Sequence, residues 1–69
     1  MDYQAFVEVM NDKFPDRNWE RFVDEYRQGG KLPFSISTAI EREIRQFIND
    51  NNQRTEDWTI FINTAKDKA

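Results

Sequence analysis

The sequence of 69 residues contains no cysteine and no histidine, and only two glycines and two prolines. Without cysteine there is no disulfide bond, thiolate metal site or cysteine nucleophile, and without histidine there is no imidazole for acid–base catalysis or zinc binding. The longest apolar runs have two or three residues, as in Ile60-Phe61-Ile62, whereas about 20 are needed to cross a bilayer. We therefore expect no metal, no cofactor and no membrane span.

The start of the chain also lacks the features of a secretory signal. It opens Met1-Asp2-Tyr3-Gln4, without the basic residues and the apolar stretch that such a signal requires. The absence of cysteine fits a reducing compartment. These features predict a cytoplasmic protein.

What the chain does contain is typical of a folded domain. It has two Trp, two Tyr and six Phe, together with 13 acidic and 10 basic residues, for a net charge of -3 and a pI near 4.8. Disordered chains usually have few aromatics and a strong charge of one sign. At this length a chain buries about 60% of its surface on folding, which leaves room for one core and one domain.

Apolar residues recur four times with the spacing i, i+3, i+4. The four triplets are Tyr3-Phe6-Val7, Trp19-Phe22-Val23, Ile44-Phe47-Ile48 and Trp58-Phe61-Ile62. Such a triplet lines one face of a helix, so the pattern predicts four amphipathic helices. The phenylalanines at the centre of the four triplets are unevenly spaced along the sequence, which argues against a tandem repeat.

Turn-forming and capping residues set the expected boundaries. Pro15 separates the first two triplets, and Gly29-Gly30 supplies a helix C-terminus. Several hydroxyls offer caps for the third helix, among them Thr38, which forms a capping box with Glu41. Thr55 is the expected cap of the last helix. We predict helices over residues 2–13, 16–28, 36–50 and 56–67.

One segment allows a second interpretation. Residues from Trp58 to Thr64 are rich in β-branched and aromatic side chains, which favour a strand. The helix is preferred because its apolar face continues to Ala65 and because no other segment alternates to give a partner strand.

The predicted fold is thus all-α: a compact, single-domain bundle of four short helices. Its expected core consists of Tyr3, Phe6, Val7, Met10, Phe14, Trp19, Phe22, Val23, Tyr26, Ile36, Ile40, Ile44, Phe47, Ile48, Trp58, Phe61, Ile62 and Ala65.

No catalytic site is predicted. The closest carboxylate groupings are Asp24-Glu25, Glu41 with Glu43, and Glu56-Asp57. Neighbouring residues point to different faces of a helix, and acid–base work needs a pocket that separates the two pKa values. We interpret these carboxylates as solvated helix surface and expect a protein that is not an enzyme.

Protein contact is the leading functional hypothesis, because four apolar residues fall outside the helical faces. They are Val9, Leu32, Phe34 and Ile60. Two of these residues have an alternative, structural role. Leu32 can cover the core, and Phe34 can pack at the start of the third helix. Ile60 lies about 150° from the centre of its helix's apolar face, so we expect it to contact another protein or, in a homodimer, a second copy of this chain.

DNA binding is the alternative. The helices over 16–28 and 36–50, with the five-residue link from Gly29 to Pro33 after the first of them, have the order of a helix-turn-helix. One strip of the second helix holds Thr38, Arg42, Arg45 and Asn49, types that can contact bases, while Lys31 and Arg27 can contact phosphates. The low pI opposes this hypothesis. A third hypothesis, an inhibitor whose acidic N-terminal half imitates nucleic acid, is weaker because the net charge is modest.

Overall fold

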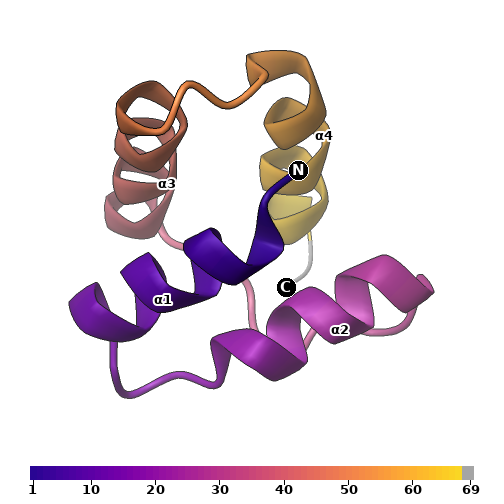
Figure 1. Cartoon of the computed structure of the whole chain (residues 1–69). Helices are drawn as coiled ribbons and strands as arrows, with labels where there is room; N and C mark the ends of the chain where they lie inside the picture. Colours follow the sequence, from indigo (N-terminus) through magenta and orange to yellow (C-terminus); the bar gives the residue numbers. More distant parts are fainter. Residues whose placement is uncertain (68–69) are drawn as a thin grey trace. The chain divides into compact units, whose positions relative to one another are not determined.

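The computed structural model describes residues 1–67, and these form four α-helices and no strand. The helices are α1 (Tyr3–Lys13), α2 (Trp19–Gln28), α3 (Thr38–Asp50) and α4 (Thr55–Asp67) (Figure 1). The prediction of an all-α fold with four helices is confirmed. No helix among the described residues combines the length and apolar character that a bilayer crossing requires.

The helices are grouped in two compact units. The N-terminal hairpin, Asp2–Pro33, contains α1 and α2, and the C-terminal hairpin, from Phe34 to the end of α4, contains α3 and α4. Within each hairpin the two helices lie side by side and run in opposite directions (Figure 1). That both hairpins belong to a single compact domain stays a prediction.

The starts of the first three helices are fixed by side-chain caps. Asp2 accepts a hydrogen bond from the Ala5 amide at 3.1 Å, and Asn18 accepts one from the Arg21 amide at 3.0 Å. The predicted start of α2 at residue 16 is therefore wrong: Asn18 caps the helix, and a turn precedes it.

The cap of α3 also differs from the prediction. Ser37 Oγ accepts a hydrogen bond from the Ile40 amide at 3.3 Å, so α3 begins at Thr38, two residues later than expected, and Thr38 is not the cap. Thr55, the expected cap of α4, is its first helical residue. At α3 Ser37 takes the capping position, and in both helices the threonine falls inside the helix.

Two helices end in the same main-chain motif. After α2, Gly29 has a φ of 73°, and the Gly30 amide donates to the Glu25 carbonyl at 2.9 Å. After α3, Asn52 has a φ of 53°, and the Gln53 amide donates to the Ile48 carbonyl at 3.0 Å. This left-handed C-terminal cap satisfies carbonyls that would otherwise lack partners.

Aromatic rings surround Trp19 in the N-terminal hairpin. Its ring centroid lies 5.7 Å from that of Phe6, 5.3 Å from Phe22 and 6.3 Å from Phe14. Phe6 meets it edge to face, with an interplanar angle of 88°, an arrangement that aromatic pairs favour. These contacts join α1 to α2.

Trp58 occupies the corresponding position in the C-terminal hairpin. Its centroid lies 5.4 Å from that of Phe47 on α3 and 5.1 Å from that of Phe61 on α4. The Ile36 amide also donates to the Ala65 carbonyl at 3.4 Å, which ties the segment before α3 to the end of α4. Each hairpin therefore has a tryptophan-centred aromatic cluster.

Most of the predicted core residues are buried, but four are only half-buried: Tyr3, Val7, Phe14 and Tyr26. Tyr3 and Val7 line a groove between α1 and α2 and so remain partly accessible. Leu32, predicted as a surface contact residue, is 5% exposed. That prediction is corrected: Leu32 belongs to the buried set, as the alternative interpretation held.

The exposure pattern in α4 also excludes the strand. Trp58 and Ile62 are fully buried, whereas Ile60 is 64% exposed. In a strand these three residues would share one side, because successive side chains alternate. In a helix Ile60 points away from its neighbours at 58 and 62.

Candidate binding surfaces

The first candidate surface is the exposed face of α4 around Ile60. Glu56 and Asp57 lie one turn before Ile60, and Asn63 and Thr64 lie one turn after it, so all five share one face. All are exposed except Thr64, which is half-buried. The Thr64 hydroxyl donates to the Ile60 carbonyl at 2.9 Å. The surface is thus a single large apolar side chain with two carboxylates at one end and neutral polar groups at the other.

The other predicted protein-contact residues do not form part of this face. Val9 is half-buried on α1, Phe34 is half-buried before α3, and Leu32 is buried. Of the four residues, the structure therefore leaves only Ile60 as a large, mostly exposed apolar side chain.

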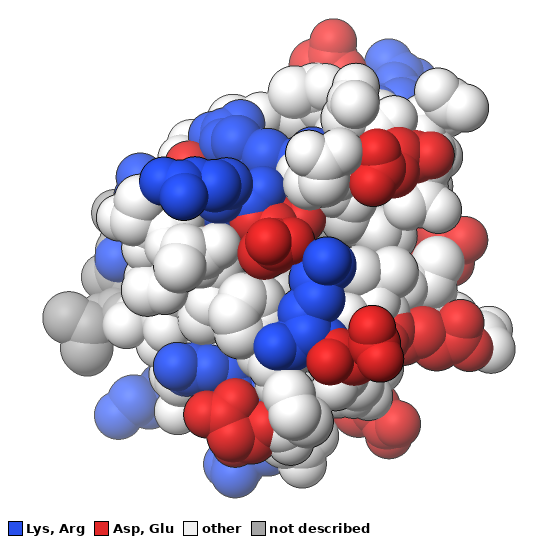
Figure 2. All heavy atoms as spheres, turned by 90° about the vertical axis from the view of Figure 1, so that its left-hand side faces the viewer, with Lys and Arg blue, Asp and Glu red and all other residues white. Residues whose placement is uncertain are grey.

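The predicted strip on α3 is the second candidate surface. Its residues are all exposed: Thr38, Arg42, Arg45 and Asn49. Lys31 is exposed too, but it lies in the N-terminal hairpin. Figure 2 shows the side of the molecule that carries α3, and there cationic and anionic side chains are interspersed instead of forming a continuous positive strip.

One basic residue of this strip is held by an ion pair. Arg45 lies 3.0 Å from a carboxylate oxygen of Glu41, and Lys66 from α4 lies 3.1 Å from the other oxygen. Hydrogen bonds from Lys66, and then from Arg45, stabilise the charged form and hold the pKa of Glu41 below its ordinary value of 4.5. Glu41 therefore links the two helices of the hairpin and offsets part of the positive charge of the strip.

The connection before α3 differs from a helix-turn-helix. Gln28 ends α2 and Thr38 begins α3, which leaves nine residues between them, whereas helix-turn-helix proteins use a turn of about 3–4 residues. The predicted five-residue link, Gly29 to Pro33, was too short because residues 34–37 also precede α3. The two helices also belong to different compact units.

A groove between α1 and α2, which the sequence reasoning missed, is the third candidate surface. Its volume is about 390 Å³, and it is lined by Tyr3, Gln4, Val7, Glu8, Asn11, Glu20, Val23, Asp24 and Arg27. On each helix these positions recur at intervals of three or four residues, so two continuous faces form its walls. That spacing was the available signal, but Tyr3, Val7 and Val23 were assigned to the core.

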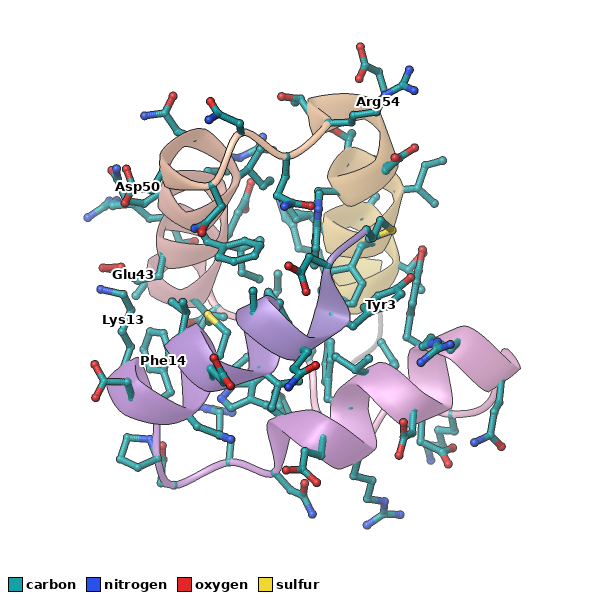
Figure 3. The ribbon with its side chains drawn as sticks, viewed as in Figure 1. Tyr3, Lys13, Phe14, Glu43, Asp50 and Arg54 are labelled. Carbon is teal, nitrogen blue, oxygen red and sulfur yellow. The ribbon has the colours of Figure 1, made fainter. Side chains whose placement is uncertain are left out.

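The charged end of this groove contains a cation–π contact. The Arg27 guanidinium carbon lies 5.1 Å from the centroid of the Tyr3 ring. Figure 3 shows Tyr3 at the start of α1, on the side facing the end of α2. Partial burial raises the pKa of Tyr26, and the nearby Tyr3 raises it further.

Among residues 1–67, no group of three or more Asp and Glu side chains is arranged to hold a metal ion. Comparisons of the chain with models of known protein families, with curated proteins and with solved structures each found no match.

Proposed function

We propose that this chain is a small, non-enzymatic binding module that makes protein contacts through the α4 face around Ile60. The observation that carries the proposal is the 64% exposure of Ile60 at the middle of a helix whose residues 58 and 62 are fully buried. Single exposed apolar residues are common. Here the side chain is flanked on its own face by charged and polar residues, the arrangement of a small apolar contact with a polar rim.

The charges on this face restrict the partner. Glu56 and Asp57 carry the negative charge at the N-terminal end, while Asn63 and Thr64 are neutral. A heterologous partner should therefore place Lys or Arg beside an apolar residue. A second copy of the chain fits only antiparallel, because parallel pairing of α4 would bring the carboxylates of both copies together.

The test replaces Ile60 with Asp and compares the variant with Ala39→Asp, which adds the same charge at an exposed position of α3. Sedimentation of the purified chain measures self-association. A photoreactive residue at position 60 or position 39, followed by cross-linking in cells, measures contact with other proteins.

The proposal expects association or cross-linking at position 60 that Ile60→Asp weakens and Ala39→Asp leaves unchanged, with the helical circular dichroism of both variants intact. A monomer at all concentrations, together with equal cross-linking from positions 60 and 39, would remove the α4 face as a contact surface.

DNA association through α3 is a second candidate, supported by the exposure of Thr38, Arg42, Arg45 and Asn49 on one helix. Replacing both Arg42 and Arg45 with Ala should weaken retention of a DNA duplex. The slope of the logarithm of the binding constant against the logarithm of the salt concentration should become shallower by roughly 2, because each phosphate contact contributes about 0.9. A wild-type chain that retains no duplex at low salt would contradict this candidate.

A further inference from the structure

The groove between α1 and α2 joins an apolar floor to an acidic rim. Val7 is half-buried and Val23 is 3% exposed, and both line the groove. Glu8 comes from α1, and Glu20 and Asp24 come from α2. All three carboxylates are exposed. The rim therefore carries negative charge on both walls.

These carboxylates are available to a ligand. Across residues 1–67, the structure gives the carboxylates of Glu8, Glu20 and Asp24 no hydrogen bond or ion pair. The one basic residue that lines the groove is Arg27, and its guanidinium already lies over the Tyr3 ring at one end. The lining therefore has three negative charges and one positive charge.

We propose that this groove binds a basic, amphipathic protein segment. The methylene stems of Lys and Arg side chains would cover Val7 and Val23, and their charged ends would bind the carboxylates of the two walls. Charge complementarity identifies the occupant, and the volume of about 390 Å³ accommodates side chains of this length. This surface belongs to the N-terminal hairpin and is separate from the α4 face, so either proposal can fail alone.

The probe is a synthetic amphipathic helix of leucine and lysine, with the corresponding leucine–glutamate helix as its charge control. Amide chemical shifts of the full chain locate the binding, and titration of a labelled peptide gives its affinity. The test variant, Glu8→Gln with Asp24→Asn, neutralises one carboxylate on each wall without changing side-chain size.

A matched variant controls for the overall charge of the protein. Asp12→Asn with Asp16→Asn removes the same two charges from exposed positions of the same hairpin that do not line the groove. Circular dichroism checks that both variants fold. Ile60→Asp should leave peptide binding unchanged, because it alters the other hairpin.

The leucine–lysine helix is expected to shift the amide resonances of the groove residues. It should bind the groove variant about tenfold more weakly than the wild type, which corresponds to the summed free energies of two surface ion pairs. The Asp12 and Asp16 variant should bind as the wild type does. No binding of the leucine–lysine helix, equal binding of the leucine–glutamate helix, or equal weakening in the two double variants would each overturn the proposal.

Discussion

The indole N–H of Trp19 donates a hydrogen bond to the main-chain carbonyl of Phe14, five residues earlier, at 3.2 Å. Trp58 repeats the relationship: its indole N–H donates to Oε1 of Gln53, also five residues earlier, at 3.3 Å. Both tryptophans are fully buried, so their polar N–H groups need such acceptors. The acceptor is main chain in one hairpin and side chain in the other, and only the second can be removed by mutation.

Replacing Gln53 with Ala should therefore destabilise the protein by about 1 kcal/mol, because the indole N–H of Trp58 loses its acceptor. Chemical denaturation measures the free energy of unfolding. Gln46→Ala is the control, since Gln46 donates to Asp50 at an exposed site and its loss should change stability by less than about 0.5 kcal/mol. Equal effects of the two substitutions would show that the indole bond contributes nothing.

The two adjacent glycines should respond differently to alanine. Gly29 has a φ of 73°, and a Cβ there would meet no atom within 4 Å, so Gly29→Ala should cost about 1 kcal/mol through backbone strain alone. At Gly30 a Cβ would lie 2.6 Å from Oε2 of Glu25, the far end of a flexible side chain that can move. Thermal unfolding should rank Gly29→Ala as the more damaging change, and the reverse order would contradict the left-handed cap.

Glu41 should make stability depend on acid pH. Because its pKa in the folded protein is lowered by Lys66 and Arg45, its stabilising contribution is present above the ordinary value of 4.5 and is lost as the pH falls through the folded pKa. The stability difference between the wild type and Glu41→Gln should thus shrink as the pH is lowered from neutral into this range. A constant difference from neutral pH to below pH 4.5 would contradict the ion pairs, and added salt should also reduce the effect.

Alanine at positions 60 and 62 tests the helical arrangement of α4. Ile62 is fully buried, so Ile62→Ala should cost about 2–5 kcal/mol. Ile60 is 64% exposed, so Ile60→Ala should change the free energy of unfolding by less than about 0.5 kcal/mol. Similar losses at both positions would indicate that Ile60 is also buried, as in a strand or in a stable dimer, and sedimentation distinguishes these two cases.

The helices could be predicted from the sequence because the spacing of apolar residues depends only on local geometry. Their starts were harder to predict, because several side chains near each start can cap a helix. Asn18 and Ser37 occupy the N-cap positions because of the conformation of the turn before each helix. The burial of Leu32 was left open for the same reason, since a loop residue has no periodicity to place it.

The candidate surfaces divide in a similar way. Ile60 could be found from the sequence, because an apolar residue on the polar side of a helix breaks a local pattern. For the groove, the spacing of residues along each helix indicated its two walls, but the sequence did not show which faces of α1 and α2 lie beside each other. Tyr3 and Val7 carry the apolar pattern of a core, yet they stand at its edge and line an open surface.

Because each hairpin contains one of the two tryptophans, the chain carries a native fluorescent reporter in each half. Trp19→Phe leaves emission from the C-terminal hairpin alone, and Trp58→Phe leaves emission from the N-terminal hairpin alone. If the two single-tryptophan proteins, each corrected for its own change in stability, melt in step with their circular dichroism, then the halves unfold as one cooperative unit, as a single domain requires. An early loss of one signal would identify the half that opens first.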